Sequence, residues 1–169
     1  MRVIIKPIIV NDVTDEYVSY LNDSKVNQYL ECRHVAQTRK SVGEYVLANI
    51  FSPNNRMFTI WVDSNRIGNI RLGSIDFNNK FADIGLVIWP DYWGKGYGSE
   101  AISLVKDYAF TTLNLHKVWA GCYTQNTGSI KAFQKAGFEI EYEIKNQYQL
   151  DGVYTDDIVL SAFNPKEMK

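Results

Sequence analysis

The centre of the sequence places an apolar segment, a glycine-rich turn and an amphipathic segment one after another. The apolar segment, residues 81–89, predicts a strand, and the turn that follows contains Gly94, Gly96 and Gly98. Residues 98–113 then carry apolar side chains at helical spacing and predict a helix. The middle of the chain therefore has the order strand, glycine turn, helix.

The glycine turn and the start of the helix together predict a binding site for an anion. Glycine adopts positive φ angles without strain and lets backbone amides approach a ligand closely. The first amides of a helix lack partners within the helix, and the helix dipole adds partial positive charge there. Such a site suits a pyrophosphate. A tight turn without a ligand is the alternative interpretation of the glycines alone.

Two familiar phosphate-binding patterns do not account for this turn. The P-loop requires Ser or Thr after Gly-Lys, whereas Gly94-Lys95 is followed by Gly96. Residues 96–101 match the dinucleotide pattern G-x-G-x-x-A, but that pattern also requires an acidic residue about 20 positions later. Residues 113–123 contain neither Asp nor Glu, so we expect a different ligand.

Two blocks of the sequence resemble the cofactor motifs of the GNAT superfamily of N-acetyltransferases. Residues 89–101 resemble its acyl-CoA loop, and within the superfamily they resemble the branch of the ribosomal-protein-alanine N-acetyltransferases. Residues 126–138 resemble its second cofactor helix, with the Asn-x-x-Ser start at Asn126 and the Gly-Phe end at Gly137. With the flanking strands, the resemblance covers roughly residues 57–162.

The patterns along the chain predict one α/β domain over residues 1–169, with a mixed, mostly antiparallel central sheet flanked by helices. Hydrophobic residues make up 46% of the 169 residues, which is enough for one core. The resemblance implies the GNAT-like acyl-CoA N-acyltransferase version of this α/β (α+β) fold. Strands are expected at residues 3–10, 57–62, 67–75, 81–89, 117–123, 139–149 and 153–163. Helices are expected at residues 11–21, within 22–37, up to about residue 51, at 98–113 and at 129–136. The helix that ends near residue 51 is expected to begin at a cap on Thr38 or Ser41. Ser41 and Glu44 have the spacing of a capping box.

Charge and cysteine content exclude several classes of function. The 18 basic and 19 acidic residues give a net charge of −1, without the basic patch that nucleic-acid binding requires. Cys32 and Cys122 lack the spacing of a metal site, so we expect no metal. No run approaches the roughly 20 apolar residues of a membrane span, and the first residues do not resemble a signal peptide. We therefore expect a soluble cytoplasmic protein without a nucleic-acid or membrane partner.

The resemblance implies acetyl-CoA as cosubstrate. The backbone amides of the glycine turn would bind its pyrophosphate, the strand before the turn would pair with the pantetheine arm, and Asn126 would hydrogen-bond that arm. The implied cofactor-binding residues are Val87, Ile88, Trp93, Gly94, Lys95, Gly96, Tyr97, Gly98, Ser99, Asn126 and Ser129.

Three positions depart from the pattern of the superfamily. Many members carry Arg or Gln where this chain has Trp93, so we expect the turn to rely on backbone amides and Lys95. Many place a Tyr as general acid where this chain has Phe133, and the Tyr is usual in polyamine acetyltransferases, so that function is disfavoured. Ser129 becomes the donor to the leaving thiolate, unless it only caps the second helix. Tyr148 stands where some relatives have a carboxylate, so that base is missing here.

The general base has three candidates. Asp83 lies on the strand that leads into the turn, although its side chain can also point away from the site. Glu31 and His34 lie in the polar segment that often borders the acceptor in this superfamily, and an unperturbed His has a pKa near 6.5. Asp156 and Asp157 are adjacent on a predicted strand, so they point to opposite faces and cannot act as a close pair.

The predicted function is transfer of the acetyl group of acetyl-CoA to a primary amine by direct attack in a ternary complex. The acceptor stays open between a protein N-terminus, an amino sugar and another small-molecule amine. The alternative function is a non-catalytic acyl-CoA-binding regulatory module, which Phe133 in the acid position favours. The late hairpin, residues 139–163, also allows the chain to form a homodimer.

Overall fold

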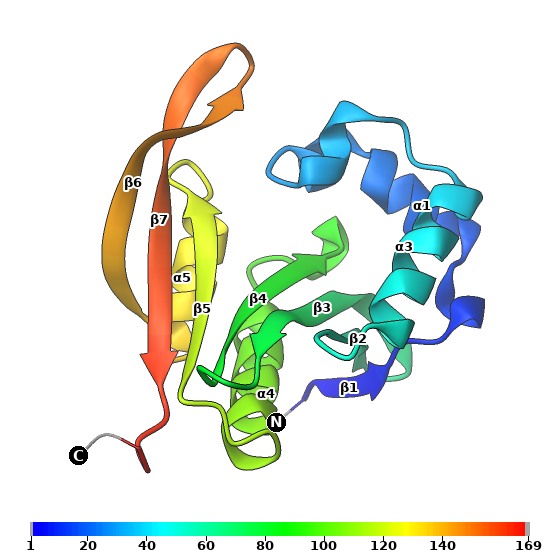
Figure 1. Cartoon of the computed structure of the whole chain (residues 1–169). Coiled ribbons are helices and arrows are strands. Elements are labelled where there is room, and N and C mark those ends of the chain that lie inside the picture. Colours follow the sequence, from blue (N-terminus) through cyan, green and yellow to red (C-terminus); the bar gives the residue numbers. More distant parts are fainter. Residues whose placement is uncertain (1, 168–169) are drawn as a thin grey trace.

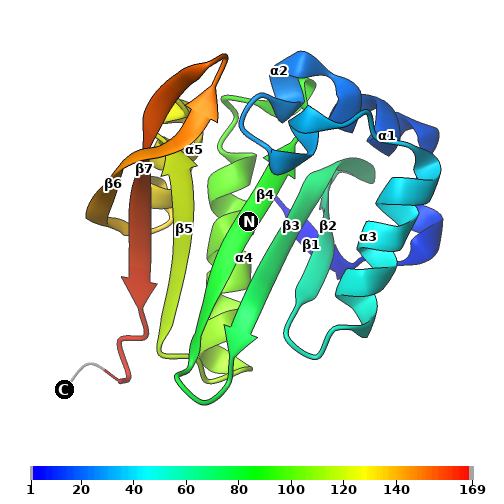
Figure 2. The same cartoon turned by 45° about the horizontal axis from the view of Figure 1, so that its top comes forward.

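The structure is a computed structural model that describes residues 2–167 of the chain. Its strands are β1 (Ile4–Pro7), β2 (Arg56–Val62), β3 (Asn65–Asp76), β4 (Phe81–Ile88), β5 (Lys117–Tyr123), β6 (Glu139–Leu150) and β7 (Val153–Phe163). Its helices are α1 (Asp15–Asn22), α2 (Ser24–Asn27), α3 (Arg39–Phe51), α4 (Tyr97–Thr111) and α5 (Thr127–Lys135), with short 3-10 helices η1 (Val10–Asp12), η2 (Glu31–His34) and η3 (Pro90–Tyr92). Figure 1 shows α4 and α5 behind the sheet and α1 and α3 beyond its β1–β3 half, while Figure 2 shows α2 above the end of β4.

The seven strands form one sheet in the order β1-β2-β3-β4-β5-β7-β6, and β4 and β5 are its one parallel pair. This mixed, mostly antiparallel sheet with flanking helices confirms the predicted fold class. The parallel pairing is short, because it ends at Asp83 and Trp119. Beyond that point β4 stays paired with β3 as far as Ile88, and β5 stays paired with β7 as far as Tyr123. The two strands therefore separate toward their C-terminal ends, and the sheet opens there (Figure 2).

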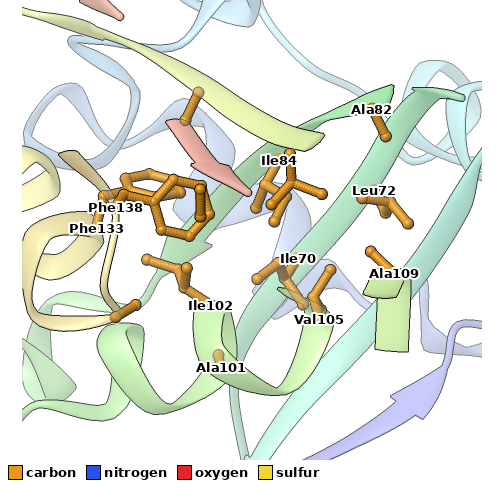
Figure 3. Packing of buried hydrophobic residues seen from close by; sticks show 14 of the residues in the cluster. Ile70, Leu72, Ala82, Ile84, Ala101, Ile102, Val105, Ala109, Phe133 and Phe138 are labelled. Atoms are coloured by element: carbon orange, nitrogen blue, oxygen red, sulfur yellow. The ribbon is translucent and has the colours of Figure 1, made fainter. Parts of the chain in front are cut away.

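The main hydrophobic core lies between the sheet and the helices α4 and α5. Ala101, Val105 and Ala109 of α4 are completely buried, which confirms the apolar stripe predicted from the sequence. Figure 3 shows this side of α4 facing Ile70 and Ile84 of the sheet. Burial of this stripe fixes the axis of α4, and it thereby fixes the glycine turn at the N-terminal end of the helix.

A second buried cluster packs α1 and α3 against the sheet near β2. Trp89, the residue after β4, belongs to this cluster and is 2% exposed. Its amide donates to the carbonyl of Ile67, and its ring stacks on Tyr20 with centroids 4.5 Å apart. The start of the glycine turn is therefore held from the side of α1 as well as from the side of α4.

The N-terminal third differs in detail from the sequence prediction. The first strand ends at Pro7, and the first helix begins at Asp15 with the side chain of Thr14 as its cap, so the prediction of residue 11 was too early. The intervening residues form η1 instead. Thr38, one of the two predicted caps, is the N-cap of α3, so the capping box joins Thr38 and Ser41 and not Ser41 and Glu44.

Within residues 2–167, no helix combines the length and the apolar character that crossing a bilayer requires. The same residues contain no group of three or more His, Cys, Asp or Glu side chains arranged to hold a metal ion. The edge strand β6 leaves Ile140 and Tyr142 about half exposed. A single domain over 1–169, a cytoplasmic location and a homodimer through the late hairpin stay predictions.

Candidate active site

A cleft of about 530 Å³ lies where β4 and β5 separate. Four segments line it: α2 with the residues that follow it, the end of β4, the glycine turn with the first turn of α4, and the exposed side of α5. The end of β4 and the glycine turn are consecutive in sequence, whereas α2 and α5 are distant from them and reach the cleft through tertiary packing.

The glycine turn has the backbone geometry that an anion site needs. Gly94 and Gly96 adopt φ angles of 73° and 82°, a region that disfavours residues with a side chain. Gly96 is also the N-cap of α4 and supplies no side-chain acceptor, so the first amides of the helix face the cleft uncapped. Arg2 braces the turn, since its guanidinium donates to the carbonyl of Lys95 at 2.8 Å and pairs with Glu100 at 2.7 Å.

Side-chain charge near the turn comes from residues that the sequence analysis missed. Lys95 does not line the cleft, because its ammonium donates to the carbonyl of Asp91 at 2.8 Å. Lys131 and Lys135 of α5 do line it. The ammonium of Lys135 lies 3.5 Å from the position that a Cβ would take at Gly96. Two lysines four residues apart at the end of a predicted cofactor helix were the available signal, since that spacing places both on one helix face.

The end of β4 offers backbone groups for an extended ligand. The amide of Trp89 bonds to β3, and alternate residues of an antiparallel strand face the same neighbour, so Val87 is also directed to β3, opposite Asn69. Leu86 and Ile88 face the side where β5 has turned away. The indole of Trp93 donates to the Ile88 carbonyl at 2.6 Å, and this leaves the Ile88 amide for a ligand. The backbone groups of Leu86 and Ile88 are therefore available to a ligand, whereas those of Val87 are directed to β3, although Val87 also lines the cleft. The expectation from the sequence named Val87 and Ile88.

The start of α5 places a hydroxyl in the cleft. The side chain of Asn126 caps this helix by accepting from the Ser129 amide at 3.2 Å. The Ser129 hydroxyl is directed elsewhere and lies 3.3 Å from the sulfur of Cys122 on β5. Burial raises the pKa of that thiol to about 11, so Cys122 stays protonated at neutral pH. Ser129 is therefore a cleft residue and not the cap of α5.

Phe133 occupies the core and not the cleft. Its side chain is 1% exposed and packs edge-on against Phe138, with ring centroids 5.1 Å apart. The ring has no proton to donate, as the sequence indicated, and Ser129 is the hydroxyl that α5 presents to the cleft.

The three candidate bases lie in different surroundings. Asp83 does not line the cleft, and its carboxylate pairs with Arg71 at 2.7 Å. His34 is exposed and also lies outside the cleft lining. The Glu31 side chain is 76% exposed, and its carboxylate accepts from the Tyr123 hydroxyl at 3.2 Å. Of the three, Glu31 alone contacts the aromatic residues beside the opening of the sheet.

These aromatic residues form a tyrosine cluster, defined here as Tyr29, Tyr123 and Tyr148. Tyr29 also lines the cleft, and its ring centroid lies 5.5 Å from that of Tyr123. Tyr148 of β6 stacks on Tyr123 at 4.5 Å, so the position where some relatives carry a carboxylate holds an aromatic wall here. The guanidinium of Arg33 lies 5.3 Å from the centre of the Tyr123 ring. The cluster joins the loop after α2 to β5 and β6, and no local sequence pattern predicts it.

Comparison with known proteins shows the family. Residues 2–139 match the profile of the acetyltransferase (GNAT) domain. The chain belongs to the GNAT acetyltransferase family. The GNAT chain is 30% identical over 115 residues to spermidine N(1)-acetyltransferase of Escherichia coli K12, an alignment that covers 68% of this chain and 62% of that enzyme. It is also 33% identical over 149 residues to an uncharacterized N-acetyltransferase, p20, of Bacillus licheniformis, with 83% of each chain covered.

Solved structures share the fold of this GNAT chain. The structure of a Vibrio cholerae spermidine N-acetyltransferase in complex with CoA and spermine superimposes with a TM-score of 0.87 at 22% identity, covering 98% of this chain and 97% of that one. A GNAT-family acetyltransferase from Bacillus anthracis gives 0.83 at 25% identity. The comparisons support the superfamily, and they do not single out the ribosomal-protein branch that the sequence resembles.

Proposed function

We propose that this GNAT chain transfers the acetyl group of acetyl-CoA to a primary amine within a ternary complex. The observation that carries the proposal is the cleft. One space brings together the uncapped amides at the start of α4, the unpaired edge at the end of β4 and the Ser129 hydroxyl. A pyrophosphate, an extended pantetheine arm and a thioester need these three features in this order.

The phosphate end of the cosubstrate would be bound by backbone and by α5. The amides of residues 96–99 would donate to the pyrophosphate, where the helix dipole favours negative charge. Lys131 and Lys135 would offset the remaining phosphate charge from the opposite wall of the cleft. With backbone amides and two lysines of α5 sharing the phosphate charge, the turn would bind phosphate although Trp93 stands in place of a charged residue.

The reacting end would use groups from β4 and α5. Acetyl-CoA supplies a thioester carbonyl that an amine can attack. The Ile88 amide would donate to the oxyanion that develops on this carbonyl, because its direction leaves it without a strand partner. Ser129 would deliver a proton to the leaving sulfur, since its hydroxyl is free of the helix cap.

The acceptor would enter beside the tyrosine cluster. The rings of Tyr29, Tyr123 and Tyr148 and the carboxylate of Glu31 suit a cationic amine, because aromatic faces attract cations. The spermidine N(1)-acetyltransferase relatives make a polyamine the first acceptor to test. A protein N-terminus is the second acceptor to test, because the branch that the sequence resembles is named for the N-terminal acetylation of ribosomal proteins.

The test has two stages. Thermal unfolding is measured with and without acetyl-CoA, with NAD as the control ligand. At 100 times its dissociation constant a ligand stabilises by about 2.7 kcal/mol, which corresponds to a shift of roughly 5–10 °C for a chain of this size. Release of CoA is then followed with spermidine and with a peptide that has an N-terminal alanine. A shift with NAD alone, or none with acetyl-CoA, would refute the assignment of the cleft.

The same measurements separate the enzyme from a non-catalytic acyl-CoA-binding regulatory module, which the buried, proton-free Phe133 favours. Such a module would give the acetyl-CoA shift but would release no CoA above the hydrolysis background with any amine. Turnover with either acceptor would exclude it.

A further inference from the structure

A buried carboxyl group lies beside the opening of the sheet without an ion-pair partner. Asp157 of β7 is 3% exposed, and its Oδ1 atom is fully buried with no hydrogen-bond partner among residues 2–167. An unpaired buried carboxylate destabilises a fold, so its presence calls for an explanation such as a functional role. Its neighbour Asp156 shows the ordinary alternative, since that carboxylate points to the other face and pairs with Lys145 at 3.0 Å.

The carboxyl group leans over a glycine at the edge of the opening. A Cβ added to Gly121 of β5 would lie 2.8 Å from Oδ2 of Asp157 and 3.3 Å from Oδ1. Gly121 is exposed, and it lies just past Trp119, the last residue of β5 that pairs with β4. The Asp157 carboxyl therefore covers Gly121 at the point where β5 leaves β4.

Ser129, the proposed proton donor, lies on the opposite face of β5 from Asp157. Cys122 follows Gly121 and points to the opposite face of the sheet, where its sulfur contacts the Ser129 hydroxyl at 3.3 Å. Asp157 and Ser129 thus flank residues 121–122 of β5 from its two faces. A thioester held at Ser129 would lie between a proton donor on the α5 face and a carboxyl group on the face of the tyrosine cluster.

The groups around Asp157 favour its neutral form. Burial is the main cause that raises the pKa of its carboxyl group, and the nearby amides of Cys122 and Ile158 act in the opposite direction. Tyr123 of β5 is its cross-strand partner, and Tyr148 of β6 stacks on Tyr123. Glu31 and Arg33 of η2 contact Tyr123, and the Cys122 thiol lies on the opposite face of the sheet. None of these forms an ion pair with it, so its affinity for a proton is set mainly by the lack of solvent.

We propose that Asp157 accepts the proton of the attacking amine, which reaches the thioester through the opening between β4 and β5 beside Gly121. This role rests on the proposed function. The ammonium group transfers one proton to the carboxylate, which passes it to solvent. The neutral nitrogen bonds to the carbonyl carbon and the C–S bond breaks. The second nitrogen proton ends on the CoA sulfur through Ser129, so one acetylated amine, one CoA thiol and one solvent proton are formed.

The other carboxylates are less suited to this task. Glu31 is mostly exposed and is held by the Tyr123 hydroxyl and by Arg33 at 3.7 Å, so it suits binding of the distant charge of an acceptor. Asp83 is held by Arg71. Of these three carboxylates, only Asp157 combines an unpartnered oxygen with a position at the edge of the opening. A base with a raised pKa takes protons more readily near neutral pH.

The test compares the full-length protein with Asp157→Asn and, as matched control, Asp156→Asn. Initial rates are measured with acetyl-CoA and spermidine between pH 6 and pH 10. We expect Asp157→Asn to lower kcat by about 100-fold or more at pH 7, in line with loss of a general base. The thermal shift with acetyl-CoA should stay within 2 °C of the wild-type value, and Asp156→Asn should behave as the wild type.

The pH dependence separates this role from a structural one. The ratio of wild-type to Asp157→Asn activity should fall as pH rises, because the amine then loses its proton to solvent without help. Gly121→Ala is the second variant, since its methyl group must displace the carboxyl group, and it should lower kcat in the same pH-dependent way. A ratio that does not change with pH, or kcat within threefold of the wild type in both variants, would overturn the role of Asp157. A wild-type protein that binds acetyl-CoA but acetylates no amine would overturn the proposed function together with this role.

Discussion

Replacement of Gly68 by alanine tests the link between the β3–β4 pairing and the cleft. Gly68 lies opposite Ile88, the residue whose amide is proposed to face the thioester. A Cβ at Gly68 would lie 2.1 Å from the carbonyl oxygen of Val87 and 3.0 Å from the Cα atom of Ile88. Both contacts are with backbone, so a side-chain rotation cannot relieve them and the two strands must move apart.

The expected loss of stability combines three effects. Overpacking costs about 1–3 kcal/mol, and rigid backbone neighbours place this site at the upper end of that range. Weakening the adjacent ladder hydrogen bond adds about 1 kcal/mol. In the opposite direction, alanine lowers the conformational entropy of the unfolded chain, which raises the free energy of unfolding by about 0.4–1 kcal/mol. We therefore expect Gly68→Ala to lower the free energy of unfolding by about 3 kcal/mol, which corresponds to a fall in Tm of roughly 6–12 °C.

Gly85→Ala on the neighbouring strand is the matched control. A Cβ at Gly85 would have no heavy atom within 4 Å, and the backbone there does not adopt a positive φ angle. This variant should raise the free energy of unfolding by about 0.4–1 kcal/mol through the same entropy effect. Urea and thermal unfolding of both variants, with and without acetyl-CoA, measure the difference. A Tm of Gly68→Ala within 2 °C of the wild type, or an equal fall in Gly85→Ala, would refute this account of the strand contact.

Three further predictions concern side chains at the site. Replacing Lys131 and Lys135 together by alanine should weaken acetyl-CoA binding by about 5-fold, at roughly 1 kcal/mol for the two exposed charges together. The loss should shrink at high salt, and Lys40→Ala on α3 should have no effect in calorimetric titrations. Ser129→Ala should lower kcat by at least about 10-fold in the CoA-release assay while the affinity for acetyl-CoA stays unchanged, and an unchanged kcat would contradict its role as proton donor. Asp157→Asn should be more stable than the wild type at pH 8, because the pKa of this carboxyl is raised in the folded protein and ionisation above that pKa destabilises the fold. The difference in stability between the two proteins is measured as the difference in urea midpoint. It should shrink as pH falls through the raised folded-state pKa toward the ordinary pKa of 3.8. Below 3.8 the carboxyl is protonated in both the folded and the unfolded chain, so no difference from ionisation remains.

Local sequence patterns were sufficient for the parts of the site that lie within a few residues of one another. The three glycines followed by the apolar stripe of residues 101–109 predicted a turn and a helix start, and both are present at Gly96 and Tyr97. Asn126 and Ser129 also lie at the predicted helix start, because capping depends on side chains three residues apart. Such features need only the helical repeat and the φ angles that each residue tolerates.

Strand register could not be read in the same way. The sequence predicted a strand at residues 81–89, but a shift of one residue exchanges the two directions in which backbone groups point. The choice between Val87 and Leu86 therefore depends on pairing with β3, which is fixed where Trp89 bonds to Ile67. No property of residues 86–88 alone decides it.

The acceptor side of the site was decided by tertiary structure alone. Glu31 and Tyr123 are 92 residues apart and meet because α2 and η2 lie over the opening between β4 and β5. Asp157 was set aside in the sequence analysis because its neighbour points the other way, yet the structure buries it over Gly121 beside that opening. The sequence by itself determined the glycine turn and most of the helices and strands, because these depend on near neighbours along the chain. The order of the strands in the sheet, which long-range packing sets, decided which distant charged side chains lie beside the opening between β4 and β5.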